Sequence, residues 1–310
     1  MEFAVNSVNG FAVGSCKEVI YCPQKAGLKS LHCVHKMSIL QRRYNMTTTS
    51  FFQRFSLLVG EDAAKLIEHS RVIVFGLGGV GSWCAEALVR SGVTNITLVD
   101  SDTVCPSNVN RQLQATSKNL KRLKTDSLAE RLKDINPSCN ITLFPSVFSE
   151  ETAASFDIPG ADYVVDAIDS LAHKLHLIEV SLDANVRFFS SMGMAQKLDP
   201  TLIKTADIWK TYGCPLARLV RQGLRKRKIS RRFTVVYSPE RIQRIPPQPA
   251  PPPDELSDSA CAASETRGMW DSGKKVINGT TVTVTAAAGM VLASLVIKDA
   301  YERAQGASVL

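Results

Sequence analysis

A glycine-rich turn constrains the fold of this chain more than any other feature. Before the turn, residues 71–75 read Arg-Val-Ile-Val-Phe, an apolar run typical of a buried parallel strand. After the turn, residues 82–90 have the spacing of a helix that stops before Gly92. A strand, a glycine turn and a helix in this order predict a site where backbone N–H groups face a phosphate. The turn contains Gly76, Gly78, Gly79 and Gly81.

Strands and helices alternate along the rest of the chain. This alternation predicts an α/β fold with a Rossmann-like, doubly wound and mainly parallel sheet, with helices on both faces. A basic helix and a strand near the C-terminal end form an appended region. Residues 281–297 are apolar but contain several threonines, which favours a buried strand and helix over a membrane span. The other expected strands are 95–99, 163–168, 186–190 and 233–237, and the expected helices are 61–69, 120–135, 171–184 and 214–228.

Segments without this periodicity mark the limits of the predicted domain. Residues 1–46 carry no motif, and we interpret them as an N-terminal extension that is flexible or arises from an early start codon, since later methionines could also begin the chain. Residues 47–303 form one predicted nucleotide-binding domain. It includes a basic segment at residues 214–232 and a proline-rich loop at residues 245–258, where six prolines fall within eight residues.

Composition excludes several other classes of protein. The chain has 310 residues, of which 45% are hydrophobic and 21% charged, so it is too apolar for a disordered protein. Its eight cysteines include no Cys-x-x-Cys pair, so the usual mark of a zinc site is missing and reduced thiols are expected. No apolar core of a secretory signal is present near the start. We therefore expect a cytoplasmic protein without a membrane partner, and the net charge of +8 favours an anionic partner.

An acidic residue closes the strand that follows the glycine turn. Asp100 stands at the end of residues 95–99, where a carboxylate can accept hydrogen bonds from ribose hydroxyls. Together with the glycine turn it predicts a nucleotide site, against the alternative that the glycines only pack a strand on a helix. These two features leave open whether the nucleotide is NAD or ATP.

A polar cluster beyond Asp100 favours ATP. The β- and γ-phosphates need cations beside them, and Arg111 and Lys124 supply a bidentate fork and a compact charge. Asp169 follows the strand at residues 163–168, at the edge where such folds bind ligands, and its carboxylate can hold Mg²⁺. Simpler alternatives are a surface ion pair for Arg111, a solvated lysine for Lys124 and a helix cap for Asp169. The candidate ATP-binding residues are Gly76, Gly78, Gly79, Gly81, Asp100, Asp102, Asn108, Arg111, Gln112 and Lys124.

These residues resemble a known superfamily. The resemblance to the ubiquitin-activating-enzyme superfamily lies in residues 76–83, 100–102, 108–112, Lys124 and residues 166–169. The superfamily includes the bacterial adenylyltransferases of thiamine and molybdopterin synthesis. Its shared chemistry is the attack of a carboxylate on the α-phosphate of ATP, which gives an acyl-adenylate and pyrophosphate.

One branch of the superfamily is more similar than the others. The tRNA threonylcarbamoyladenosine dehydratases resemble this chain at residues 190–193, 197–200, 207–211, 214–218 and 235–238. The resemblance implies an enzyme that adenylates the carboxylate of a threonylcarbamoyl group on an adenosine beside the tRNA anticodon. A nitrogen of the same modification would then displace AMP and close a hydantoin-type ring.

The resemblance also implies roles for single residues. Asp100 would bind the ribose, and the glycine turn would line the phosphates. Asn108, Arg111 and Lys124 would hold the triphosphate and stabilise charge as pyrophosphate leaves. Asp169 would bind Mg²⁺, so the implied cofactors are ATP and Mg²⁺.

Arg54 adds an expectation about assembly. It lies six residues before Gly60, where the superfamily has an arginine that reaches the ATP of a partner subunit, so the resemblance implies a homodimer. The alternative is a plain surface or helix-capping role. The candidate catalytic residues are Arg54, Arg111, Lys124 and Asp169.

Two other functions remain open from the sequence. Superfamily members that activate the C-terminus of a small ubiquitin-like sulfur-carrier protein often hold zinc through two Cys-x-x-Cys pairs, and this chain has none. A nicotinamide oxidoreductase would not need the cluster around Arg111 and Lys124. Because the superfamily serves sulfur transfer, a cysteine-desulfurase system is a candidate protein partner.

A basic segment indicates where a polyanion could bind. Residues 218–232 contain eight cations and no acid, and Lys and Arg bind RNA by neutralising its phosphates. Helical spacing places four of these cations on one face, and it places Leu216, Leu219 and Leu224 on another, apolar face. The alternative is a solvated cationic face without a partner. The candidate tRNA-binding residues are Arg218, Arg221, Arg225, Lys226 and Lys228.

Overall fold

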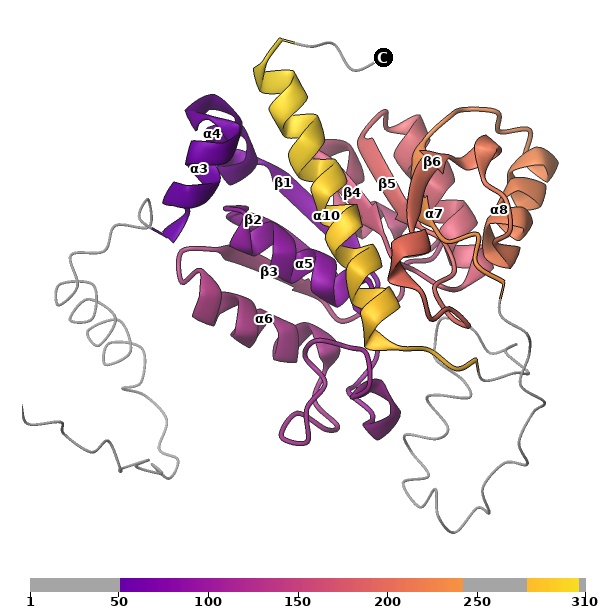
Figure 1. The fold of residues 1–310 in the computed structure, drawn as a ribbon, viewed down its shortest axis with the longest axis horizontal. Coiled ribbons are helices and arrows are strands. Elements are labelled where there is room, and N and C mark those ends of the chain that lie inside the picture. Colours follow the sequence, from indigo (N-terminus) through magenta and orange to yellow (C-terminus); the bar gives the residue numbers. More distant parts are fainter. Residues whose placement is uncertain (1–50, 242–277, 307–310) are drawn as a thin grey trace, which may run out of the picture. The chain divides into compact units, whose positions relative to one another are not determined.

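The computed structural model describes residues 51–241 and 278–306. Contacts within the chain divide it into two units, Met1–Thr47 and Thr48–Leu310, and all of the described residues belong to the second unit (Figure 1). The extension predicted at residues 1–46 and the proline-rich loop predicted at residues 245–258 lie outside the described residues.

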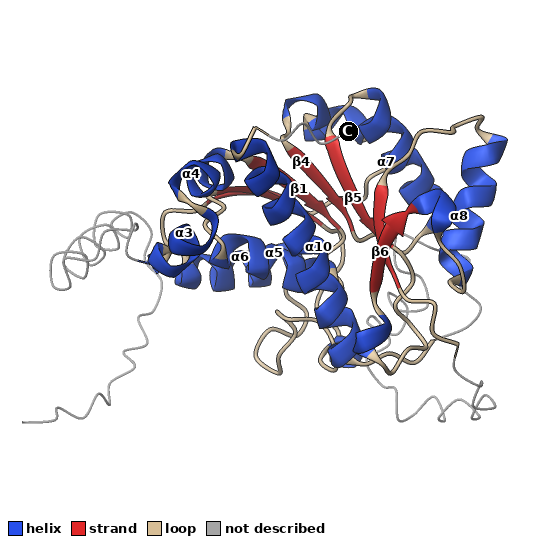
Figure 2. Ribbon diagram, turned by 45° about the horizontal axis from the view of Figure 1, so that its top comes forward, coloured by secondary structure: helices blue, strands red, loops and turns tan. Residues whose placement is uncertain are grey.

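The described residues form one sheet with helices on both of its faces (Figure 2). The strands are β1 (Arg71–Phe75), β2 (Asn95–Val99), β3 (Asn140–Phe144), β4 (Tyr163–Asp166), β5 (Arg187–Ser191), β6 (Lys204–Asp207) and β7 (Thr234–Tyr237). The α-helices are α3 (Gln53–Val59), α4 (Glu61–His69), α5 (Gly81–Arg90), α6 (Lys124–Ile135), α7 (Leu171–Asp183), α8 (Pro215–Lys226) and α10 (Val282–Ala304). The 3₁₀ helices are η1 (Pro106–Asn108), η2 (Ala153–Phe156), η3 (Ile158–Gly160), η4 (Pro200–Leu202) and η5 (Ile208–Lys210).

The strand order locates the edge at which a ligand can bind. The order is β3-β2-β1-β4-β5-β7-β6, and every neighbouring pair is parallel except β6 with β7. The chain winds outward from β1 in both directions, so the carboxyl ends of β1 and β4 form the switch point of the sheet. This confirms the predicted doubly wound α/β fold. We expected the basic helix α8 and strand β7 as an appended region; β7 instead extends the same sheet, and α8 packs on one of its faces.

Strand β1 shows how the sequence fills the two faces of the sheet. Val72 and Val74 pack in one core with α5, α6 and α10, whereas Ile73 and Phe75 pack in a second core with α7 and α8. Alternate residues of a strand point to opposite faces, so a run in which all are apolar fits a strand covered on both sides. The four side chains are almost completely buried, as the sequence predicts for a central parallel strand.

Helix α10 closes the first of these cores. It crosses that face of the sheet next to α4 and α5 (Figure 1). By length and composition this helix is apolar enough to span a membrane. However, its side chains from Val284 to Ala300 supply the core with a buried stripe, and this packing accounts for the apolar composition. The strand predicted to precede this helix is wrong, because Val282–Ala304 is one continuous helix.

Two further boundaries differ from those expected. The helix predicted from residue 120 begins at Lys124, because residues 119–122 form a turn in which Lys121 has a φ of 68°. The sequence patterns also failed to predict β3 and β6. Both are edge strands with partly exposed side chains, so neither has the continuous apolar run of a central strand.

The described cysteines are mainly buried thiols. Cys84, Cys139 and Cys214 are free and buried, and burial raises the pKa of Cys139 to about 11.

Candidate functional site

The glycine turn joins β1 to α5 at the switch point of the sheet. Gly76 has a φ of 86°, and a Cβ atom there would lie 2.8 Å from the carbonyl oxygen of Ala167. A Cβ on Gly81 would lie 1.8 Å from the carbonyl oxygen of Gly76, so glycine is required for this close approach. At Gly78 no atom lies within 4 Å of such a Cβ, which leaves the backbone open to a ligand. The turn therefore has the shape that a phosphate site needs.

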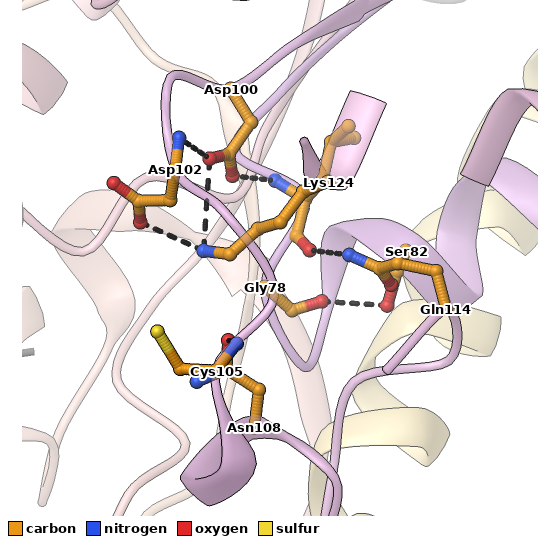
Figure 3. Close-up of polar contacts among 9 residues, drawn as sticks. Gly78, Ser82, Asp100, Asp102, Cys105, Asn108, Gln114 and Lys124 are labelled. Atoms are coloured by element: carbon orange, nitrogen blue, oxygen red, sulfur yellow. Dashed lines mark hydrogen bonds and ion pairs between the residues drawn. The ribbon is translucent and has the colours of Figure 1, made fainter. Parts of the chain in front are cut away.

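Asp100 holds this turn in place. Its carboxylate accepts hydrogen bonds from the backbone N–H of Leu77 at 2.7 Å and of Asp102 at 2.9 Å (Figure 3). Lys124, the first residue of α6, donates to the Asp102 carboxylate at 2.7 Å and lies 3.7 Å from that of Asp100. The structure thus brings together three of the predicted ATP-binding residues, and Asp100 also has a positioning role that the sequence did not reveal.

The ammonium group of Lys124 is buried among carboxylates. Burial acts to lower its pKa, but the charges of Asp100, Asp102 and Asp169 outweigh burial and raise the pKa of Lys124. The lysine therefore stays charged at neutral pH. This environment does not fit the alternative of a solvated lysine on a helix surface, since only 7% of the side chain is exposed.

Arg111 lies over the same turn. Its Cγ is 3.2 Å from the point that a Cβ on Gly79 would occupy, and its carbonyl oxygen accepts a hydrogen bond from Nε1 of Trp83 at 3.0 Å. Its guanidinium group donates to the carbonyl oxygen of Ser107 at 2.7 Å and to Oδ1 of Asn110 at 2.9 Å. The cation is therefore anchored beside the glycine turn, as the ATP hypothesis requires.

The loop between β2 and α6 places further amides at the site. Oδ1 of Asn108 accepts a hydrogen bond from the backbone N–H of Cys105 at 3.1 Å, and Nε2 of Gln114 donates to the carbonyl oxygen of Leu77 at 2.9 Å (Figure 3). Among the residues that the structure describes, Oε1 of Gln112 and Oε1 of Gln114 are buried without a hydrogen-bond partner. Such acceptors usually meet a water or a ligand. Gln114 was not predicted from the sequence.

Asp169 lies on the loop that follows β4, three residues beyond the end of that strand. Its side chain is exposed, and its charge contributes to the raised pKa of Lys124. The two residues are therefore close enough to interact, at the carboxyl ends of the strands, where doubly wound folds have their ligand crevice. The neighbouring Asp166 is completely buried, so only the second acid of the Asp-Ala-Ile-Asp sequence can meet a ligand.

Arg54 is not brought to this crevice within one chain. It is an exposed residue of α3, and the ring of Phe52 beside it packs 3.8 Å from where a Cβ on Gly92 would lie. Gly92 follows the end of α5, whereas the glycine turn precedes its start, about 15 Å away along a helix of ten residues. A role at the site would need a second copy of the chain.

The basic helix α8 packs through Leu224 and Leu216, as expected, but not through Leu219. Its buried side chains are those of Ala217, Val220 and Leu224, which pack in the second core. Leu219, which the helical spacing placed on the apolar face, is exposed on the same side as Arg218 and Lys226. The prediction for Leu219 is therefore wrong.

The predicted tRNA-binding residues occupy different settings along α8. Arg218 and Lys226 are exposed. Arg221 donates a hydrogen bond to Oγ1 of Thr211, and Arg225 lies 5.5 Å from the centre of the Trp209 ring. Lys228 follows the end of the helix with a φ of 59°. The structure therefore gathers these cations along one helix and the turn after it, about 12 Å from Arg218 to Lys226.

A second buried lysine was not predicted from the sequence. Lys174 donates to Oδ2 of Asp166 at 2.6 Å and to the hydroxyl of Ser190 at 3.3 Å, and all three side chains are buried between the carboxyl ends of β4 and β5. Nothing in the sequence around Lys174 distinguishes it from a surface lysine of a helix.

This geometry can be compared with that of known proteins. The sequence pattern of the ThiF family matches residues 52–307. The chain belongs to the ThiF family. It is 43% identical to the tRNA threonylcarbamoyladenosine dehydratase of Bacillus subtilis over 189 residues, which cover 61% of this chain and 74% of that protein. This ThiF-family chain therefore falls in the branch that the sequence resemblance indicated.

Solved structures agree with this assignment. Those of Escherichia coli tRNA N6-threonylcarbamoyladenosine dehydratase in complex with AMP and with ATP match at TM-scores of 0.70 and 0.69. The identity is 30%, and the match covers 83% of this chain and 96% of that chain. By contrast, the adenylyltransferase and sulfurtransferase UBA4 of Saccharomyces cerevisiae is 29% identical over 149 residues, 48% of this ThiF-family chain and 33% of that protein.

Proposed function

We propose that this protein is an ATP-dependent dehydratase that cyclises threonylcarbamoyladenosine in tRNA. The match to about three quarters of the Bacillus subtilis dehydratase carries the proposal. A carboxylate oxygen of the threonylcarbamoyl group attacks the α-phosphorus of ATP, and the bond to the bridging oxygen of pyrophosphate breaks. A nitrogen of the same modification then attacks the acyl carbon, AMP leaves and a proton is released. The nucleoside loses one water in total.

We assign Lys124 to the charge that develops as pyrophosphate leaves. Its ammonium group is charged, and it is already positioned by Asp102, whose side chain is 25% exposed. Phosphate oxygens can therefore share or replace this partner without moving the lysine. A charge held in place before the reaction stabilises the transition state without the cost of reorganising solvent.

The remaining predicted residues surround the same space. The open backbone at Gly78 can receive a phosphate, and Arg111 can form a bidentate contact with it. Asn108 and Gln112 are buried amides on the adjoining loop, and Asp100 and Asp102 lie at the end of β2, where a ribose binds in doubly wound folds. This arrangement supports ATP as the nucleotide.

The residues present also fit a magnesium ion. Mg²⁺ is usually held by one or two carboxylates together with substrate phosphates. Asp169 supplies an exposed carboxylate in the crevice, and its charge acts on Lys124. When bound, the ion would supply positive charge to the phosphate oxygens. If Asp169 holds it, Asp169→Asn should raise the Mg²⁺ concentration needed for half-maximal turnover, and an unchanged requirement would remove the assignment.

We also propose a homodimer in which Arg54 serves the partner's site. Helix α3 exposes Leu57 and Leu58 almost completely beside Arg54, and exposed leucines of this kind are typical of a protein interface. Because α3 lies away from the glycine turn of its own chain, only a partner could use this arginine.

Mixed dimers test this arrangement. Arg54→Ala and Lys124→Met variants should each be inactive alone. When the two are mixed and exchange subunits, one site of each mixed dimer has its own Lys124 and the partner's intact arginine, so activity should return. If Arg54 acts within its own chain, or if light scattering finds a monomer, no activity will return.

The cations of α8 support tRNA as the substrate. Arg218, Lys226 and Lys228 are exposed and could neutralise phosphates. We expect the Arg218→Ala, Lys226→Ala and Lys228→Ala triple variant to bind tRNA more weakly and with a shallower dependence on salt. An unchanged salt dependence would exclude this helix as the binding surface. A tRNA substrate also favours the cytoplasm as the site of action.

A second candidate function is the activation of a small sulfur-carrier protein. The similarity to UBA4 supports it, but that match covers only a third of the other protein. In this case a partner from a cysteine-desulfurase system would be expected. The two candidates differ in the molecule whose carboxylate is adenylated.

One experiment separates the two candidates. The enzyme is incubated with ATP, Mg²⁺ and tRNA that carries threonylcarbamoyladenosine, and the nucleosides released by digestion are weighed by mass spectrometry. Loss of one water supports the dehydratase. An unchanged mass, together with pyrophosphate exchange that depends on a carrier protein, would overturn the proposal in favour of the second candidate.

A further inference from the structure

Tyr212 presents an aromatic ring to solvent while its hydroxyl is held in place. The residue is 55% exposed and lies between η5 and α8. Nζ of Lys204 lies 2.9 Å from the Tyr212 hydroxyl and 5.6 Å from the centre of the ring. The ring of Tyr237 packs against it edge-on at 5.9 Å and 75°. The ring of Tyr212 is therefore fixed by two contacts and still has an open side.

The position of this ring places it on the same edge of the sheet as the nucleotide site. Lys204 begins β6 and pairs with Tyr237, the last residue of the parallel strand β7. Both therefore lie at the carboxyl edge, where β1 and β4 end at the ATP crevice. Three strand spacings separate β4 from β6 in the order β4-β5-β7-β6, which corresponds to about 14 Å. A nucleic acid reaching the crevice can extend over this distance.

The surroundings of Tyr212 favour an anionic partner. Residues 204–232 contain ten cations and one acid. Arg218 is exposed on the first turns of α8, which begins beside the end of β5, since Sγ of Cys214 lies 3.9 Å from the carbonyl oxygen of Gly193. The segment before Tyr212 is held by the hydrogen bond from Arg221 to Thr211.

Two acids that are close in sequence to Tyr237 and Lys204 already accept hydrogen bonds. The Glu240 carboxylate accepts hydrogen bonds from the backbone N–H groups of Leu198 and Asp199. The Asp199 carboxylate accepts from the backbone N–H and the hydroxyl of Thr201. These contacts reduce the repulsion that the two carboxylates would exert on a phosphate backbone near Lys204.

We infer that Tyr212 is a stacking platform for an unpaired base of the tRNA substrate, with Lys204 and Arg218 beside it for the flanking phosphates. Single-stranded loops of RNA are recognised mainly by stacking of splayed bases on aromatic side chains, combined with cationic contacts to the backbone. An exposed ring that contacts a lysine, six residues before an exposed arginine and on the same edge as the ATP site, has this combination. The inference rests on the proposed function, because it assigns a further binding residue to the same substrate.

Three variants of Tyr212 test the inference with the full-length enzyme. Loss of one stacked base weakens binding by about tenfold or more. We therefore expect Tyr212→Ala to raise the KM for tRNA carrying threonylcarbamoyladenosine by about tenfold while the KM for ATP is unchanged. Tyr212→Phe, which keeps the ring, should stay close to the wild type. Tyr212→Trp should also bind, and the fluorescence of the new tryptophan should be quenched by tRNA.

Tyr301→Ala is the matched control. Tyr301 is also exposed, but it lies on the last turns of α10 near Arg303, which contacts Tyr163 at the amino end of β4. This variant should leave the KM for tRNA unchanged. Thermal unfolding of each variant shows whether the protein is folded. If Tyr212→Ala is poorly folded, the KM for tRNA of Tyr212→Phe is compared with that of Tyr212→Leu instead.

The dependence of binding on salt separates stacking from a charge effect. A stacked base releases no counterions, so Tyr212→Ala should leave the salt slope of tRNA binding unchanged, whereas Arg218→Ala should reduce it by about one. A reduced slope in Tyr212→Ala would mean that the ring only positions Lys204, and it would overturn the stacking role. A KM for tRNA within twofold of the wild type would overturn it as well. If instead the wild-type enzyme does not dehydrate the nucleoside in tRNA, the proposed function fails, and this inference fails with it.

Discussion

Lys124 and Lys174 both place an ammonium group on an aspartate at the carboxyl edge of the same sheet. Lys174 and its partner Asp166 have no exposed side-chain surface, and the Nζ–Oδ2 distance is 2.6 Å. Lys124 is also buried, with a distance of 2.7 Å to Asp102, but a quarter of the side chain of Asp102 is exposed. The two pairs are thus similar in geometry and differ in whether one partner meets solvent.

This difference separates a site from a structural contact. A buried ion pair is by itself weak evidence for stability or function, because the cost of desolvation can exceed the attraction. A ligand can compete for Lys124, since Asp102 is accessible and the raised pKa keeps the lysine charged. Lys174 has no such access, and its hydrogen bonds to Asp166 and Ser190 join β4 to β5. We therefore expect activity to depend on the first pair and stability on the second.

The largest effect is expected on turnover when the charge of Lys124 is removed. Lys124→Met should lower the rate of nucleoside dehydration about 10²- to 10³-fold, the usual loss when a preorganised charge stabiliser is removed. The rate is measured from the mass of the digested nucleosides over time. Lys133→Met, on the exposed face of the same helix, is the control and should keep the wild-type rate. A Lys124→Met rate within a few fold of the control would contradict the comparison.

The next effect is expected on stability when the charge of Lys174 is removed. Lys174→Met leaves Asp166 buried without a cation and should cost about 3–5 kcal/mol of unfolding free energy, measured by urea denaturation. Adding Asp166→Asn removes the unpaired charge and should restore part of this loss. Lys65→Met, which breaks the exposed pair with Glu61, should cost less than about 1 kcal/mol. If Lys174→Met and Lys65→Met lose the same unfolding free energy, burial of the Lys174–Asp166 pair does not contribute to stability.

The sequence predicted Lys124 and Asp102 as site residues and gave no sign of the pair between Lys174 and Asp166, and the reason is physical. Lys124 follows a glycine turn, an acid at a strand end and Arg111. These neighbouring motifs indicate that its charge binds phosphate. Lys174 is one lysine among apolar residues of a helix, and its partner Ser190 comes from another strand. A contact of this kind depends on the register of β4 with β5, which the sequence does not display.

The elements of the fold also differ in how well the sequence predicted them. Central strands such as β1 are apolar throughout because both faces are covered, and the sequence predicted them within one or two residues. The edge strands β3 and β6 are partly exposed and were missed. Leu219 was assigned to the wrong face because helical spacing gives the period of the pattern and not the identity of the face that packs.

Glu86 offers an intermediate case between the two lysine pairs, and its effect should be the smallest. Its carboxylate is buried on α5, but its partners Arg90 and Arg131 have side chains that are about half exposed. Burial acts to raise the pKa of Glu86, and the hydrogen bonds from Arg131 and Arg90 outweigh it, so the pKa lies below its ordinary value of 4.5. A lowered pKa means that the ionised form of Glu86 stabilises the fold above pH 4.5. This contribution is lost as the pH falls through the pKa of Glu86 in the folded protein.

Glu86→Gln should therefore lower the unfolding free energy by about 1 kcal/mol at pH 7, because exposed partners weaken the pair. In urea titrations the gap between the variant and the wild type should narrow below pH 4.5. If the difference in unfolding free energy between Glu86→Gln and the wild type stays constant with pH, the effect of Glu86 comes from its packing in the core. The order of the effects of the three ion pairs would then not follow from their solvent access.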